Sequence, residues 1–193
     1  MPILAGIIFL VGFLFVSNRN EGDMILKSGR KMLYDLADID PDDQSGGYKK
    51  DHDFAFEKAS VKWQVPFALL KAHAIKESSL NPRAFMDENP TKRTDRIGWA
   101  SRGLMQVLWW PGSNRFAKYG YPDSILAGGE KLFDPEVGCD IGAQIIRDNL
   151  KACGGNLRDA VNMYNTGKKE AAYPAPGEYV NKVLNYYNKI RGV

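Results

Sequence analysis

Glu77 is the acidic side chain best suited to acid–base chemistry, because the sequence places it at the edge of an apolar helix. The helix is predicted to begin at Pro66 and must end before Pro82. At 100° per residue, Glu77 falls near Leu70 on the flank of its hydrophobic face. Burial there disfavours the carboxylate, and so does the negative end of the helix dipole. The pKa of Glu77 is therefore expected to be raised, which suits a general acid that protonates a leaving oxygen.

Two other interpretations of Glu77 remain open from this helix alone. The carboxyl group could lie in solvent at the helix end or pair with a lysine. His73, one turn earlier, would oppose the shift in pKa if it were cationic.

Several other chemistries lack a basis in the sequence. It contains no phosphate-binding glycine motif, no HExxH helix and no GxSxG elbow. The two histidines and two cysteines do not have the spacing of the usual zinc ligand sets, so we expect no metal and no cofactor. Cys139 and Cys153 lie on one predicted helix, roughly 21 Å apart, and are expected to be free thiols.

Four short segments resemble one known family when they are read in order. They are Glu77-Ser78-Ser79-Leu80-Asn81-Pro82, Gly103-Leu104-Met105-Gln106-Val107, Met163-Tyr164-Asn165-Thr166-Gly167 and Tyr179-Val180-Asn181-Lys182-Val183. Together they are similar to the soluble-lytic-transglycosylase-type domain, over roughly residues 54–190. The resemblance implies a mainly helical, lysozyme-like fold. It also implies cleavage of the β-1,4 bond between N-acetylmuramic acid and N-acetylglucosamine in peptidoglycan glycan strands.

The resemblance assigns roles residue by residue. Glu77 would be the catalytic acid and then base, with Ser78 as its neighbour in the motif. Gly103 would allow close approach of a sugar, and Gln106 would offer amide hydrogen bonds. The full set of implied substrate-binding residues is Ser78, Gly103, Met105, Gln106, Tyr164, Asn165 and Tyr179.

Each of these positions also has a purely structural interpretation. Leu104 and Met105 are typical core residues, Gly103 and Gly167 suit turns, and Tyr179 could simply pack a helix. Trp109 and Trp110 follow the second segment and suit either stacking on sugar rings or covering the core.

The number of carboxyl groups bears on the mechanism. Hydrolysing glycosidases usually place two carboxyl groups across the scissile bond, whereas the four segments supply only Glu77. A one-acid route that forms 1,6-anhydromuropeptides is therefore favoured. The stretch from Arg83 to Arg102 departs from the family pattern and contains Asp87, Glu88 and Asp95. If one of these entered the cleft, a goose-type lysozyme-like hydrolysis with water would be the alternative.

Capping signals predict the elements that must position these residues. Helices are expected over 52–64, 66–78, from Asp134 to the Gly154-Gly155 pair, 156–165 and 178–190. A small β-hairpin or an irregular loop is expected at 85–105. The length of 193 residues and 44% apolar composition fit one principal domain. The net charge of +3, with no basic stripe, does not indicate a nucleic-acid partner.

The first residues form a separate hydrophobic segment. Residues 1–17 are predicted as a hydrophobic helix, either an uncleaved membrane anchor or a signal segment, and residues 18–50 as a connector. The catalytic domain would then be 51–193. Because its substrate lies outside the cytoplasmic membrane, we expect a single-pass inner-membrane protein with a periplasmic domain, or a virion-associated one. A non-catalytic wall-binding module of a larger envelope or phage assembly is the competing hypothesis.

Overall fold

The computed structural model describes residues 52–89, 91–175 and 178–192, which all belong to one compact unit, Gln44–Val193. The expected anchor at 1–17 and the connector at 18–50 lie outside the described residues. Among the helices that are described, none combines the length and the apolar character needed to cross a membrane.

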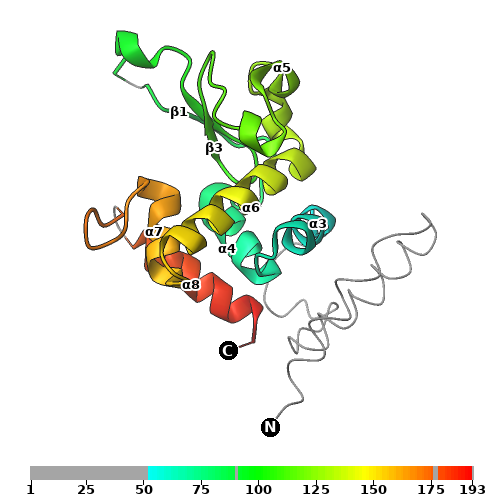
Figure 1. The fold of residues 1–193 in the computed structure, drawn as a ribbon, viewed down its shortest axis with the longest axis vertical. Helices are drawn as coiled ribbons and strands as arrows, with labels where there is room; N and C mark the ends of the chain where they lie inside the picture. The colour runs from blue at the N-terminus through cyan, green and yellow to red at the C-terminus, as the bar shows by residue number, and fades with distance from the viewer. Residues whose placement is uncertain (1–51, 90, 176–177, 193) are drawn as a thin grey trace, which may run out of the picture. The chain divides into compact units, whose positions relative to one another are not determined.

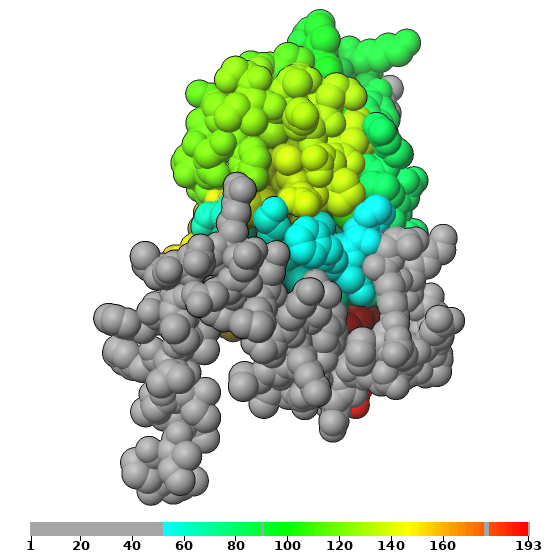
Figure 2. Space-filling view, turned by 90° about the vertical axis from the view of Figure 1, so that its right-hand side faces the viewer, coloured from blue at the N-terminus to red at the C-terminus, as the bar shows by residue number. Residues whose placement is uncertain are grey.

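Six α-helices are the main elements of the described chain (Figure 1). In chain order they are α3 (Asp53–Trp63), α4 (Phe67–Ser78), α5 (Asp123–Leu126), α6 (Pro135–Ala152), α7 (Leu157–Thr166) and α8 (Tyr179–Ile190). Helix α4 packs mainly against α8, and α3 packs against α6. Figure 2 shows the cyan surface of α3 next to the yellow-green surface of the later helices. The mainly helical fold expected from the sequence is therefore confirmed.

The helix ends follow the local signals in the sequence. Asp134 caps α6 by accepting a hydrogen bond from the Glu136 N–H, and Asn156 caps α7. Pro66 differs from the prediction by one position, because it lies just before the first helical residue of α4. At the other end Ser79 has a left-handed backbone with φ of 54°, which stops α4 before Pro82.

The stretch at 85–105, expected as a hairpin or an irregular loop, forms most of a three-stranded antiparallel sheet. Its strands are β1 (Phe85–Asp87), β2 (Ala100–Arg102) and β3 (Val107–Trp109), in the order β1-β2-β3. Phe85 pairs with Arg102, and Asp87 pairs with Ala100. Because side chains alternate along a strand, these four residues share one face, and Met86 and Ser101 lie on the other.

The core lies between α4, α6 and the turn that joins β2 to β3. Leu70, Met105 and Ile141 have no exposed surface there. Cys139 and Cys153 are both free and buried, which confirms the prediction of two free thiols. Burial raises the pKa of the Cys139 thiol, so this group stays protonated at neutral pH.

Candidate active site

Glu77 lies in the last turn of α4 and is partly buried. The hydroxyl of Tyr179, the first residue of α8, donates a hydrogen bond to its Oε1. Burial raises the pKa of Glu77, while the Tyr179 hydrogen bond and then the charge of Lys76 lower it, and the charge of Glu88 raises it slightly. Burial has the largest effect, so the net shift is upward, as the sequence predicts.

His73 lies one turn before Glu77 and is completely buried. Burial lowers the pKa of its imidazole to about 3, so the ring is neutral at physiological pH and does not oppose the shift at Glu77. Its Nδ1 lies 3.2 Å from the hydroxyl oxygen of Tyr179. Glu77, Tyr179 and His73 therefore form a continuous chain of hydrogen bonds from the surface of α4 into the core.

Ser78 joins the end of α4 to the turn between β2 and β3. Its hydroxyl lies 3.0 Å from the Ala74 carbonyl and 2.8 Å from the Leu104 carbonyl, and donates to both. The Ser78 hydroxyl is thus hydrogen-bonded to the protein main chain. This contact fixes the position of the second family segment beside Glu77.

Gly103 and Gln106 shape the same turn. A Cβ at Gly103 would lie 2.0 Å from the Leu132 carbonyl oxygen, so the close approach it permits is to the protein's own backbone. The Gln106 amide nitrogen donates to the Ala84 carbonyl at 3.1 Å and the Gly103 carbonyl at 3.0 Å. Both residues thus support the wall near Glu77, where the resemblance implied contacts with a sugar.

The remaining predicted residues differ in exposure. The side chain of Met105 is fully buried, so only its main chain is available, and its carbonyl accepts a hydrogen bond of 2.7 Å from the Tyr164 hydroxyl. The Tyr164 ring packs against His73 with 4.6 Å between ring centroids. Asn165 is exposed near the end of α7. The structure therefore gathers Tyr179 and Tyr164 behind Glu77 and leaves Asn165 at the surface.

Of the three acids between Arg83 and Arg102, Glu88 alone influences Glu77. Its Oε1 accepts a hydrogen bond of 2.6 Å from the Ser101 hydroxyl, on the sheet face shared with Met86. Asp87 is on the opposite face, and Asp95 forms an exposed ion pair with Arg93. Glu88 is therefore the second carboxyl group to consider in the site.

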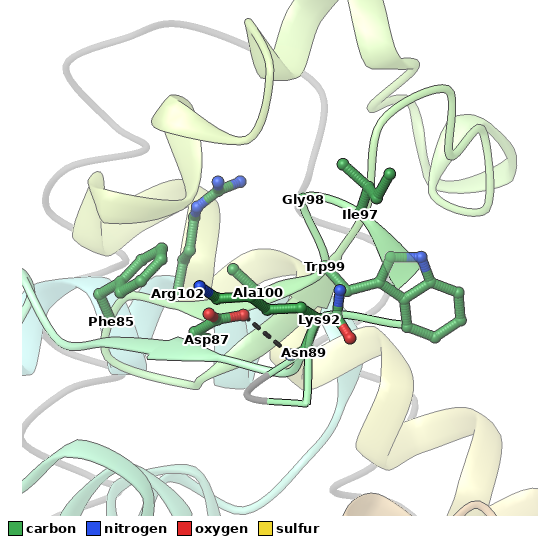
Figure 3. A pocket seen from close by; sticks show the side chains of 9 residues that line it. All are labelled: Phe85, Asp87, Asn89, Lys92, Ile97, Gly98, Trp99, Ala100 and Arg102. Atoms are coloured by element: carbon green, nitrogen blue, oxygen red, sulfur yellow. Dashed lines mark hydrogen bonds between the residues drawn. The ribbon is translucent and has the colours of Figure 1, made fainter. Parts of the chain in front are cut away.

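The opposite face of the sheet carries a separate hollow with a volume of about 480 Å³ (Figure 3). It is lined by Phe85, Asp87, Asn89, Lys92, Ile97, Gly98, Trp99, Ala100 and Arg102. None of the predicted site residues lines this hollow. Since the face of Ser101 and Glu88 points the other way, the hollow is distinct from the surroundings of Glu77.

The two neighbouring tryptophans have different roles. Trp109 is buried, and its indole N–H donates to Asp123 at 2.9 Å, so it covers the core. Trp110 stacks on Trp99 with 4.6 Å between ring centroids, and the Arg115 guanidinium lies over its ring. These contacts already occupy the rings that the sequence suggested could stack on sugars.

The role of His73 as a partner of Tyr179 was missed from the sequence. The available signal was a histidine within a run of apolar residues, one turn before a candidate catalytic acid. Its partner lies 106 residues further along the chain, so no local pattern could identify it. Within residues 52–89, 91–175 and 178–192, no group of three or more acidic, histidine or cysteine side chains is arranged to hold a metal.

Comparison with known proteins finds a matching family model and a solved structure of similar fold. Residues 54–175 match the family model described as "Transglycosylase SLT domain". The fold is similar to that of an inactive mutant of lytic transglycosylase Slt from Pseudomonas aeruginosa, with a TM-score of 0.60 and 20% sequence identity. That similarity covers 78% of this chain and 25% of the Pseudomonas chain, so this chain spans about a quarter of that protein. No curated protein matches the sequence.

Proposed function

The chain belongs to the transglycosylase SLT domain family and has its lysozyme-like fold, and on that premise we propose that it is a peptidoglycan lytic transglycosylase with Glu77 as acid and then base. The observation that carries the proposal is the position of Glu77. A partly buried carboxyl group with a raised pKa receives a hydrogen bond from Tyr179 at the junction of α4 and α8. The substrate would be the MurNAc–GlcNAc β-1,4 bond.

In the first half of the reaction, protonated Glu77 gives its proton to the leaving O4 as the glycosidic bond breaks. The substrate's own N-acetyl group stabilises the cationic C1 of the muramoyl sugar. Burial supports this half, because it keeps the carboxyl group protonated nearer to neutral pH.

In the second half, the Glu77 carboxylate accepts the proton of the muramoyl C6 hydroxyl, whose oxygen bonds to C1 and closes the 1,6-anhydro ring. Glu77 is thereby returned to its protonated state, and no water is consumed. The Tyr179 hydroxyl supports this half, because its hydrogen bond stabilises the carboxylate. The attacking hydroxyl is already part of the substrate, which gives it a high effective concentration.

One observation favours a second candidate reaction, a goose-type lysozyme-like hydrolysis. Glu88 is close enough to influence the pKa of Glu77 and is held by Ser101. A second carboxylate at this position would be able to orient a water molecule towards C1. The products distinguish the two reactions, since a hydrolysed fragment is one water heavier than an anhydromuropeptide.

The proposal is tested by zymography on purified peptidoglycan with the full chain. We expect the wild type and a Glu130→Gln control, which changes an exposed acid on another element, to clear the wall, and Glu77→Gln to lose clearing. Equal clearing by Glu77→Gln would refute the assignment. Binding to the wall without clearing by the wild type would indicate a non-catalytic wall-binding module.

Mass spectrometry of the released fragments then decides between the two reactions. Anhydromuropeptides that persist in Glu88→Gln support transglycosylation by Glu77 alone. Hydrolysed fragments that disappear in Glu88→Gln would establish the lysozyme-like reaction.

We also propose that residues 1–17 attach the protein to the inner membrane and that the catalytic domain faces the periplasm, alone or within a larger envelope or virion assembly. The support is the uncharged apolar run Pro2 to Val16 together with a substrate outside the membrane. Alkaline extraction of membranes and protease treatment of spheroplasts test this. Release of the protein by alkali, or resistance of the domain to external protease, would contradict it.

A further inference from the structure

His73 is a fully buried titratable group for which the proposed reaction has no step. Its ring has no exposed surface, Nδ1 is within hydrogen-bond distance of Tyr179, and Nε2 has no hydrogen-bond partner in the described part of the chain. A buried polar atom without a partner costs free energy, so the ring needs an explanation beyond packing.

The hydrogen bonds determine which nitrogen carries the proton. Tyr179 has one hydroxyl proton, and it donates that proton to Oε1 of Glu77. Its oxygen then accepts from His73, and because a proton on Nε2 would find no acceptor among the described residues, we place the proton of the neutral ring on Nδ1. The lone pair of Nε2 then faces the core. Moving the proton to Nε2 would require a partner there, and none is present among the described residues.

We propose that His73 is a positioning residue that sets which oxygen of Glu77 carries the catalytic proton. The fixed Nδ1–H holds the oxygen of Tyr179, and Tyr179 consequently donates to Oε1 whether Glu77 is protonated or ionised. The acidic proton of Glu77 is then left on Oε2, where it can pass to the leaving oxygen and later be replaced by the proton of the C6 hydroxyl. The catalytic consequence of this inference rests on the proposed function, whereas the tautomer of His73 does not.

Other titratable groups near this chain of hydrogen bonds do not replace His73. Lys76 on α4 and Glu88 after β1 act on Glu77. Cys139 on α6 and Arg115, which precedes the 3₁₀ turn at Ala117–Tyr119, act on Tyr164. From α3, Asp53 pairs with Lys71. The described hydrogen-bond partners of the Tyr179 hydroxyl are His73 and Glu77, and none of these other groups is among them.

The tautomer is measured directly by ¹⁵N NMR of the full chain labelled at histidine. The sequence has two histidines, so His52→Gln assigns the remaining imidazole to His73. We expect a neutral ring with a protonated Nδ1 at neutral pH, the less common tautomer in water. A protonated Nε2 in the wild type overturns the inference, whatever the activity assays show.

The catalytic consequence is tested with two substitutions of different chemistry. His73→Asn keeps a side-chain N–H at the position of Nδ1, whereas His73→Phe keeps a ring but loses the donor. We expect turnover of peptidoglycan to fall about tenfold in His73→Phe and to stay within about threefold of the wild type in His73→Asn, with KM unchanged in both. The upper pH limit of activity should also rise in His73→Phe, because Tyr179 then donates less effectively to the carboxylate.

Failure of this inference differs from failure of the proposed function. Wild-type turnover and pH profile in His73→Phe, or equal losses in both His73 variants, overturn the positioning role while Glu77→Gln remains inactive. Retained clearing by Glu77→Gln overturns the proposed function, and the NMR measurement still decides the tautomer.

Discussion

Replacing Tyr179 with phenylalanine is expected to move the upper pH limit of activity to higher pH. The tyrosine is only 4% exposed, so its ring should keep its packing when the hydroxyl is removed. Glu77 would then lose the hydroxyl that donates to Oε1. Burial, which raises the pKa of Glu77, would remain, and the charge of Lys76 would be the chief effect left to oppose it.

The size of this effect follows from the strength of the lost hydrogen bond. A hydrogen bond to a charged group contributes about 1.5–3 kcal/mol. At about 1.36 kcal/mol per pH unit, its loss moves the upper limit of the pH profile by about one to two units. The sign is upward, because the ionised form of Glu77 loses a stronger hydrogen bond than the protonated form does, and the protonated acid persists to higher pH. The second half of the reaction should slow at the same time, because the less stabilised Glu77 carboxylate on which it depends forms less often.

The assay is the rate of clearing of a peptidoglycan suspension by the full chain across a range of pH. Tyr173→Phe is the matched control, because this tyrosine is 56% exposed and is not among the described partners of Glu77. We expect its profile to match that of the wild type. An upper limit that stays in place or moves to lower pH in Tyr179→Phe would show that Tyr179 does not stabilise the Glu77 carboxylate.

Three further substitutions test the environment of the site through stability. Because folding raises the pKa of Glu77, the folded state binds more protons than the unfolded state, and stability falls as pH rises through this range. Glu77→Gln should therefore raise Tm relative to the wild type more at about pH 8 than at about pH 4, and an equal change at both would contradict it. Gly103→Ala should cost at least about 2 kcal/mol in urea unfolding, because of its φ of +74° and the Leu132 carbonyl, and a cost below about 0.5 kcal/mol would contradict the described turn. Ser78→Ala should cost about 1 kcal/mol in the same assay through the lost bond to Leu104, and an unchanged midpoint would show that this bond is not formed in solution.

Local signals were sufficient to predict five of the six described α-helices, all but α5, and the place of Glu77 on one of them. Asp134 and Asn156 are caps that bond to main-chain groups within three residues, so their effect can be read from a short window. Likewise, the left-handed residues after Ser78 satisfy the need for the helix to stop before Pro82. These predictions are correct because the interactions that decide them are close in sequence.

The sheet and the supporting turn were less accessible from the sequence. Each strand has only three residues, and β1 is exposed along its whole length, so no alternation of polar and apolar residues marks it. Gly103 illustrates the same limit, since the atom that requires a glycine belongs to Leu132, on a later element. The resemblance identified the position, but only the fold shows which group approaches it.

The surroundings of Glu77 show how one carboxyl group can serve both halves of the proposed reaction. Burial alone would favour the protonated acid and make its carboxylate difficult to form, whereas full exposure would leave it ionised before the leaving oxygen arrives. The structure places Glu77 at the carboxyl end of α4 and beside the first residue of α8. The dipoles of these two helix ends act on the carboxylate in opposite directions, and Tyr179 adds a direct donor. Burial thus sets the upward direction of the shift, and the start of α8 keeps the ionised form accessible for the second proton transfer.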